Sequence, residues 1–113
     1  MSALLKFPFR QRKAPERAPV SPEGEAKLYL RRALRAASEE RHDVAMVFCR
    51  KALDLSPADL AARLLLAWLY DRAFGDVDQA VAAYRKVITL AGYDATNPYC
   101  VSAREALDAL VKK

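Results

Sequence analysis

Three side chains of this 113-residue sequence are of the types that nucleophilic or metal chemistry uses: His42, Cys49 and Cys100. A thiol nucleophile needs a base within reach, and a structural zinc site needs about four ligands at short spacings. One histidine and two widely separated cysteines supply neither arrangement, and the sequence has no glycine-rich phosphate-binding loop. We expect His42 at an exposed turn and both cysteines in apolar helical surroundings, where a free cysteine packs as a small hydrophobic residue. The sequence therefore predicts a non-enzymatic protein without a metal or other cofactor.

The basic residues that could bind an anionic surface are concentrated near the N-terminus. Residues 1–20 hold five basic residues and one acidic residue, a net charge of +4, whereas residues 21–113 hold 14 basic and 13 acidic residues, a net charge of +1. The N-terminal segment also contains three prolines and no sustained hydrophobic period. These features predict an extended or disordered arm.

Three roles are open for this arm. It is a plain disordered start, or it docks into a hydrophobic groove of its own or a neighbouring chain, or it tethers the protein to an anionic membrane or an acidic partner. The residues of such a tether would be Leu4, Leu5, Lys6, Phe7, Phe9, Arg10, Arg12 and Lys13. Because the remainder of the chain is near neutral and has no evident basic stripe, we do not expect nucleic acid as a partner.

The overall composition favours helices. The chain is 53% hydrophobic with only three glycines, and alanine, leucine and arginine dominate. These residues lose little side-chain freedom in a helix. No apolar run approaches the roughly 20 residues that span a bilayer, and the N-terminus, interrupted by Lys6 and Pro8, does not resemble a signal peptide. Two cysteines fit a reducing compartment, so we expect a cytoplasmic protein.

Start and stop signals divide residues 21–113 into five helices joined by short turns, which predicts an all-α antiparallel stack. The expected helices run from the Ser21 cap to a turn near residues 40–42, over residues 43–55, over residues 60–73, from the Asp76 cap to Leu90, and from the Asn97 cap to residue 112. Ser56 is the expected cap of the third helix, and Asp76 with Gln79 resembles a capping box. Gly75 and Gly92 are expected to end the helices before them.

Two stretches of the chain repeat one pattern at a distance of thirty-five positions. The paired residues are Asp43 and Asp78, Ala45 and Ala80, Cys49 and Tyr84, Arg50 and Arg85, and Lys51 and Lys86. The pattern resembles the tetratricopeptide repeat, whose signature is an aromatic-x2-Leu-Gly-x2-Tyr helix, then Ala-x3-Phe, then proline. In that family small residues let paired helices approach closely, and aromatic residues fill the gaps between them.

The two units match this signature unequally. The second unit reads Leu66-Ala67-x2-Tyr70 and Ala80-x3-Tyr84, with Gly92 at the place of the proline. The first reads Tyr29-x2-Arg32-Ala33-x2-Ala36, Ala45-x3-Cys49, Ala52 and Pro57. Departures from the signature are Arg32 for leucine, Ala36 for tyrosine, Cys49 for phenylalanine and Arg63 for the leading aromatic residue. The second unit is one residue longer, which we assign to an insertion at Phe74.

The resemblance implies a right-handed superhelical stack of helix-turn-helix repeats. The repeats would cover residues 26–57 and 60–92, and a capping helix would cover residues 97–112. The alternative is a generic helical bundle. Three repeats are usually needed for a self-sufficient stack, so docking of the arm or formation of a homo-oligomer would help to stabilise this one.

The resemblance also implies a concave groove, which in this family usually holds a peptide of another protein. The residues expected to face it are Lys27, Leu30, Arg31, Leu34, Leu64, Trp68, Asp71, Arg72 and Tyr99. Leucines and a tryptophan stand where family members that grip a carboxyl terminus have lysine, asparagine and arginine. An apolar groove with a charged rim fits an amphipathic helix or a hydrophobic extended segment. Packing in the core remains the alternative for Leu30, Leu34, Leu64 and Trp68. We therefore predict a protein-interaction module, an adaptor, scaffold or assembly factor, and as the alternative a tethered protein acting through the arm.

Overall fold

The computed structural model describes residues 21–112, which form five α-helices with no strand among them. The helices are α1 (Pro22–Ser38), α2 (His42–Leu55), α3 (Leu60–Trp68), α4 (Val77–Leu90) and α5 (Pro98–Val111), and a π-helical turn, η2 (Leu69–Ala73), directly follows α3. The predicted all-α fold is confirmed. The predicted N-terminal arm, with all of its tether residues, lies outside the described residues.

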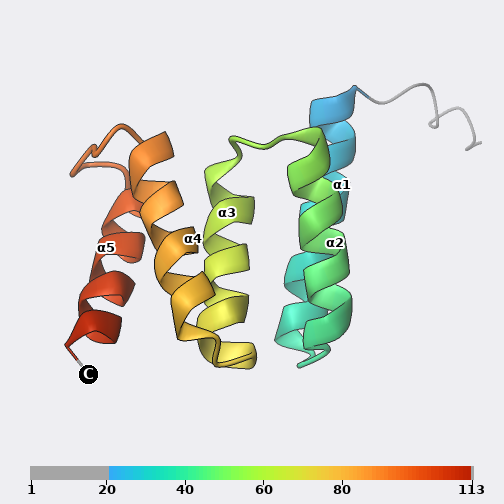
Figure 1. The fold of residues 1–113 in the computed structure, drawn as a ribbon. Coiled ribbons are helices and arrows are strands. Elements are labelled where there is room, and N and C mark those ends of the chain that lie inside the picture. Colours follow the sequence, from blue (N-terminus) through green and yellow to red (C-terminus); the bar gives the residue numbers. More distant parts are fainter. Residues whose placement is uncertain (1–20, 113) are drawn as a thin grey trace, which may run out of the picture.

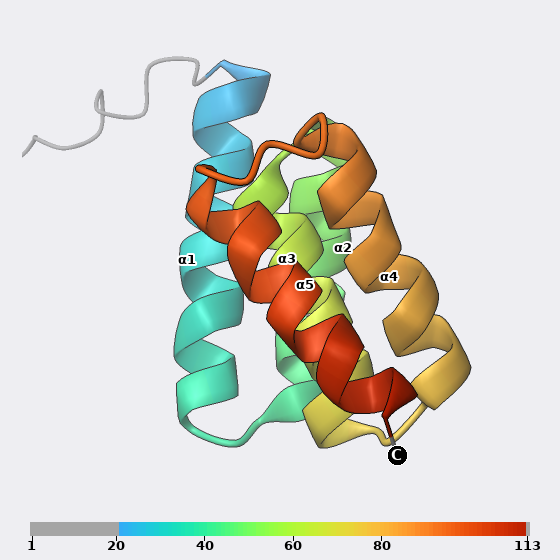
Figure 2. The same ribbon diagram turned by 90° about the vertical axis from the view of Figure 1, so that its left-hand side faces the viewer.

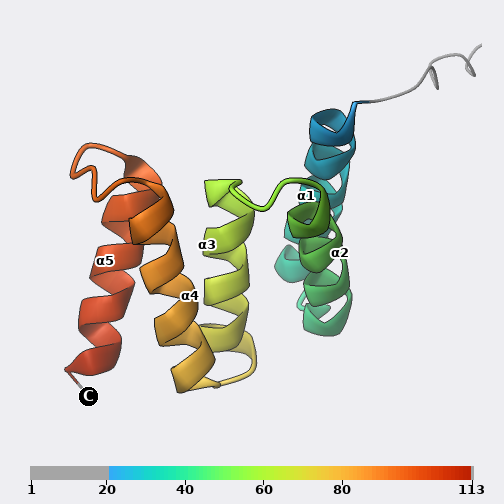
Figure 3. The ribbon, with the colours of Figure 1, turned by 45° about the horizontal axis from the view of Figure 1, so that its top comes forward.

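The helices stand side by side as a series of helical hairpins (Figures 1 and 3). α1 packs against α2, α3 packs against α4, and α5 packs on α4 at the end of the stack. In the turned view α1 and α4 lie on opposite sides, with α5 across the front (Figure 2). Within residues 21–112, no helix has both the length and the hydrophobicity to cross a bilayer.

Capping interactions fix several helix ends where the sequence predicts them. The Ser21 hydroxyl accepts a hydrogen bond from the Gly24 N–H at 3.0 Å at the start of α1. The Asn97 side-chain oxygen accepts two backbone N–H groups, at 2.9 and 3.1 Å, at the start of α5. Gly92 follows α4 with a φ of 69°, a left-handed conformation that glycine adopts without strain.

The predicted cap of α3 is wrong. Asp59, not Ser56, is the N-cap residue, and its carboxylate accepts the Ala62 N–H at 3.1 Å. Ser56 ends α2 instead. Both residue types are good caps, but only aspartate adds a negative charge at the positive end of the helix dipole. The cap therefore lies three residues after the predicted one, whereas α3 begins at Leu60, as predicted.

The predicted capping box at α4 is half formed. The Asp76 carboxylate accepts the Gln79 N–H at 3.2 Å, as expected of the cap. The Asp76 N–H, which Gln79 would have to satisfy in a capping box, instead donates to the Tyr70 carbonyl at 2.8 Å. The end of η2 thus takes over the role that the sequence assigns to the glutamine.

The extra residue of the second unit is held in a π-helical turn. At the end of η2 the Phe74 N–H donates to the Leu69 carbonyl at 3.0 Å, a bond that spans five residues instead of four. A π turn holds one residue more than the α turn that it replaces. The extra residue, predicted at Phe74, therefore lies within residues 69–73 instead. The backbone groups of this longer turn still find hydrogen-bonding partners.

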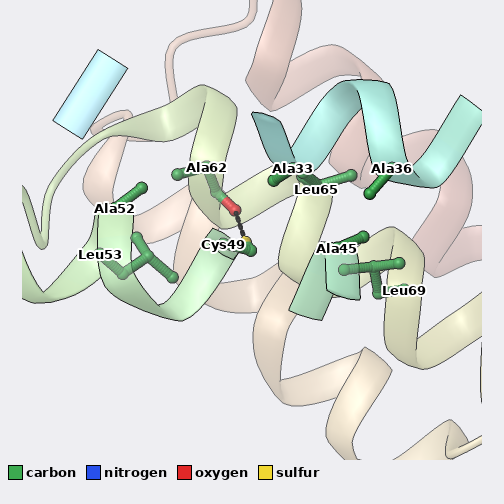
Figure 4. Packing of buried hydrophobic residues seen from close by; sticks show 9 residues of the cluster. All are labelled: Ala33, Ala36, Ala45, Cys49, Ala52, Leu53, Ala62, Leu65 and Leu69. Carbon is green, nitrogen blue, oxygen red and sulfur yellow. Dashed lines mark hydrogen bonds between the residues drawn. The ribbon is translucent and has the colours of Figure 1, made fainter. Parts of the chain in front are cut away.

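The core consists of two clusters of mostly small side chains. The first joins α1, α2, α3 and η2 and contains Ala33, Ala36, Ala45, Cys49, Ala52, Leu53, Ala62, Leu65 and Leu69 (Figure 4). The second joins α3, α4 and α5 and contains Ala67, Ala80, Tyr84, Val87, Ile88, Cys100 and Ala103. Ala45 and Ala80 are both fully buried, one in each cluster. Small side chains at these places let the paired helices approach closely.

Both cysteines are free and lie in these clusters, in agreement with the expected apolar packing. The Cys49 thiol donates a hydrogen bond to the Ala62 carbonyl at 3.2 Å and so links α2 to α3 (Figure 4). Burial raises the pKa of the Cys49 thiol from 9.0 to about 11. The thiol is therefore neutral and shielded at physiological pH, which is the opposite of what a reactive cysteine requires.

We expect alkaline pH to destabilise the fold through this thiol. Because the pKa of Cys49 is higher in the folded than in the unfolded chain, the contribution of the neutral thiol is complete below pH 9.0 and is lost toward about pH 11. The loss is on the order of 1 kcal/mol per pH unit in this range. Urea titrations on either side of pH 9.0, followed by circular dichroism, measure it. Cys49→Ala is the control, and an equal alkaline loss in both proteins would contradict the assignment.

Candidate partner-binding groove

A mainly apolar hollow of about 560 Å³ opens between α1, α3 and α5. We call it the groove. It is lined by Leu34, Ala37 and Ser38 of α1, by Ala61, Leu64, Leu65 and Trp68 of α3, and by Tyr99 of α5. Within α1 and α3 the lining residues are three or four positions apart, so each helix presents one face to the groove. Four of the nine predicted groove residues are brought together here: Leu34, Leu64, Trp68 and Tyr99.

The exposure of these side chains separates groove residues from core residues. Leu34 is 49% exposed, Tyr99 is 39% exposed and Trp68 is 36% exposed, so none of the three is a core residue. Leu64 is half-buried against the second cluster and also lines the groove. Leu30 is half-buried against the first cluster and does not line the groove, so for this residue the core alternative is correct. The binding role of the other four stays a prediction.

Trp68 is held on one side by a residue of the first repeat. The His42 and Trp68 rings meet edge to face, with centroids 6.1 Å apart and planes inclined by 61°. His42 is the first residue of α2 and is half-buried, so its predicted place at an exposed turn is wrong. The turn between α1 and α2 lies at residues 39–41, one residue earlier than expected, and α2 therefore begins at the histidine. The contact fixes the indole ring while about a third of its surface stays open to solvent.

Asp71 does not line the groove, contrary to the prediction. Its carboxylate accepts a hydrogen bond from the Tyr84 hydroxyl of α4 at 2.9 Å and lies 3.7 Å from the Arg72 guanidinium. Burial, and then the hydrogen bond from Tyr84 to Asp71, raise the pKa of the Tyr84 hydroxyl well above its usual range. Regular α-helical spacing would put Asp71 one turn beyond Trp68 on the same face, but the wider π turn changes this register. Arg72 likewise lies outside the groove lining.

The two predicted basic groove residues of α1 stand on the outer surface of this helix. Lys27 and Arg31 are exposed, and neither is among the groove-lining residues. Arg31 follows Lys27 by four positions and precedes Arg35 by four, so the three residues form one basic row along the helix. This row is the basic stripe that the near-neutral total charge of residues 21–113 conceals.

Four further residues, which the sequence did not indicate, line the groove: Ala37, Ser38, Ala61 and Leu65. Each is three or four positions from a predicted groove residue, so the helical period could have found them. Small side chains carry no hydrophobic signal of their own, and Leu65 is itself nearly buried in the first cluster. Together with the larger side chains they complete the groove lining.

The described residues contain no other assembly that points to chemistry. Among residues 21–112, no group of three or more histidine, cysteine, aspartate or glutamate side chains could hold a metal ion. The groove itself contains neither a nucleophile in contact with a base nor a cluster of charges.

The fold and the groove define a helical-repeat protein of the kind that binds other proteins. The tetratricopeptide repeat family matches residues 36–95, more than half of the sequence. The chain belongs to this family, whose repeats generally mediate protein–protein interaction and form a non-catalytic fold. Neither a curated protein nor a solved structure matches the chain. The family match begins within α1 and ends before α5, which agrees with the departures from the signature in the first helix.

Proposed function

We propose that this chain is an adaptor or assembly factor whose groove holds an apolar segment of a partner protein. The observation that supports this most directly is that Leu34, Trp68 and Tyr99 extend from three helices into one hollow and remain substantially exposed. Single exposed apolar residues are normal on a protein surface, whereas a continuous apolar depression is typical of a binding site. The segment would be an amphipathic helix or an extended hydrophobic chain.

The lining disfavours a partner that binds through a free carboxylate. None of the groove-lining residues among the described part of the chain is basic. A carboxylate is usually recognised by arginine or lysine side chains that make charge-assisted hydrogen bonds. Burial of apolar side chains, at about 25 cal/mol per Å², would instead supply most of the affinity.

An unbiased peptide selection tests the proposal. Random peptides long enough to form helices or extended segments are displayed and selected on the full chain. We expect the selected peptides to be apolar on one face and to lose binding to Leu34→Asp, because a charge at this side chain would have to be desolvated by the peptide. Val47→Asp is the matched control, because Val47 is 53% exposed and lies on α2, outside the groove.

The binding of the selected peptides to Leu34→Asp shows whether they occupy the groove or another surface. Selected peptides that bind Leu34→Asp as tightly as the parent would show that the groove is not the site. The same peptides are then tested on a chain that lacks residues 1–20. Binding that depends on this segment and not on Leu34 would favour the alternative function, in which the basic arm attaches the protein to an acidic partner or an anionic surface.

A further inference from the structure

The basic row on α1 runs directly beside the groove. Lys27, Arg31 and Arg35 follow one another at intervals of four residues and are all exposed. Arg31 and Lys27 precede the groove residue Leu34 by three and seven positions, which places them next to it on the helix surface. Arg35 lies eight positions after Lys27, so the row is roughly 12 Å long at about 1.5 Å per residue. A segment that fills the groove therefore passes within reach of two or three of these cations.

The three cations of this row form no ion pair within the described part of the chain. Both ion pairs within residues 21–112 lie elsewhere, between Arg41 and Glu39 and between Arg72 and Asp71. The acidic residues of α1 are confined to its first turn. Glu23 precedes Lys27 by four positions and Glu39 follows Arg35 by four, but Glu39 pairs with Arg41 and neither glutamate forms an ion pair with the row. Arg31, in the middle of the row, has no acidic residue three or four positions away on α1, so the row presents a positive edge beside the groove.

The neighbouring residue Arg32 has a different role. Its guanidinium lies over the Phe48 ring of α2, 5.9 Å from the centroid, and Phe48 stacks on Tyr29 at 6.1 Å. Such a contact is a cation–π interaction between the two helices of the first repeat. Arg32 therefore belongs to the packing of α1 on α2, and the three cations of the row remain available beside the groove.

The opposite edge of the groove has no such charge. Tyr99 of α5 lines the groove, and the residues three and seven positions after it, on the same face, are Ser102 and Ala106. One edge of the groove is therefore basic and the other is uncharged. A partner helix with one acidic edge and one uncharged edge therefore matches the groove only when its acidic edge faces α1.

We propose that the partner segment is an amphipathic helix whose apolar face fills the groove and whose α1-facing edge carries a row of aspartate or glutamate residues. This inference rests on the proposed function of the groove and names the class of partner. Its apolar face would contact Leu34, Leu64 and Trp68, and its acidic row would lie along Lys27, Arg31 and Arg35. Electrostatic pairs at such an exposed edge contribute more to orientation, specificity and association rate than to affinity.

The positive charge of the row favours an acidic helix over the other two candidate occupants, the chain's own arm and nucleic acid. The chain's own arm carries five basic residues and one acidic residue, so it has the same sign as the row and would be repelled by it. Nucleic acid has the right sign, but binding to its backbone alone would leave the adjacent apolar groove open. An acidic amphipathic helix matches both the groove and its basic edge.

Charge-swapped peptides and variants test the inference. The starting peptides are those that bind the parent chain but not the Leu34→Asp variant. Each is made in three forms, with glutamate, glutamine or lysine along one edge of its apolar face. They are titrated into the full chain with the fluorescence of its single tryptophan, Trp68, as the signal. We expect the glutamate form to bind about tenfold more tightly than the lysine form, with a preference that weakens as salt is added. Double substitution Arg31→Glu and Arg35→Glu should invert the preference.

A matched control separates local from long-range charge. Arg85→Glu with Lys86→Glu changes the net charge by the same amount on the exposed surface of α4 and should leave the preference as in the parent. Equal binding of the three peptide forms would overturn the acidic partner and leave the groove function standing. If no selected peptide depends on Leu34, the proposed function itself fails and the inference with it.

Two further outcomes would assign the site to another occupant. A short single-stranded DNA that displaces the peptides and loses affinity in the Arg31→Glu, Arg35→Glu variant would show that the row binds phosphates. A dimer of the full chain in analytical ultracentrifugation that Leu34→Asp dissociates would assign the groove to a second copy. Either result overturns the acidic helix.

Discussion

Replacement of Trp68 by alanine is expected to leave the chain folded and to weaken the binding of groove peptides by about 2 kcal/mol or more, a loss of about thirtyfold. The indole ring lines the groove between Leu64 and the edge contact with His42 and remains 36% exposed. A ring that is partly open in the free protein becomes fully buried when a partner covers it. Aromatic residues in such places are frequent anchors of protein interfaces.

Circular dichroism melts and peptide titrations on the same variant measure the two effects separately. Because Trp68→Ala removes the intrinsic fluorophore, its titrations are followed with a labelled peptide. Phe74→Ala is the matched control, since Phe74 is also a large exposed aromatic residue, at the end of the same helical segment but outside the groove lining. A folded Trp68→Ala protein with unchanged peptide affinity would refute the anchor. A variant that unfolds would show that the packing of Trp68 on His42 is required for folding and would also refute the expected result.

Leucine at both Ala45 and Ala80 is expected to lower the free energy of unfolding by about 2–6 kcal/mol. Both alanines have no exposed surface and lie where paired helices pack, Ala45 in the first cluster and Ala80 in the second. Three additional carbon atoms at either place must displace a neighbouring side chain or the opposing helix, which costs about 1–3 kcal/mol. The two alanines lie in different clusters, so the costs should add to about 2–6 kcal/mol, much of the stability of a small domain.

Urea titrations of the two single variants and the double variant, followed by circular dichroism, measure these costs. Ala82→Leu is the matched control, because Ala82 lies on α4 two residues from Ala80 and is exposed. The control should be as stable as the parent. If the single variants were also as stable as the parent, the close helix packing at the two repeat positions would be disproved.

The helices themselves were predictable because their signals are local. An alanine- and leucine-rich segment that follows a Ser21 or Asn97 cap can satisfy its own backbone hydrogen bonds whatever surrounds it. The repeat was predictable for a related reason, since Ala45 and Ala80 occur at equal places in two similar units. The groove followed in part, because residues three or four positions apart on a helix share a face, as Leu64 and Trp68 do.

The sequence did not reveal which of two similar residues or positions the structure uses, or where charges gather on the surface. Ser56 and Asp59 are both adequate caps, and the structure uses Asp59, whose carboxylate also interacts favourably with the helix dipole. The additional residue of the second unit could be placed at Phe74 or in the preceding helix with equal justification from spacing alone. The summed charge also conceals where the charges lie, since the basic row on α1 is averaged with the 13 acidic residues spread over residues 21–113.

The sequence by itself determined the number of helices, most of their ends, the repeat family and the apolar character of the groove. Each of these follows from hydrogen bonds or hydrophobic periods within about one or two turns of helix. Only the tertiary structure decided that Leu30 packs in the core while Leu34 faces solvent, that His42 contacts Trp68, and that Asp71 binds Tyr84. The physical reason is that burial and side-chain partners depend on which helices meet and in what register. In the second repeat this register is changed by one residue through the π turn at residues 69–73.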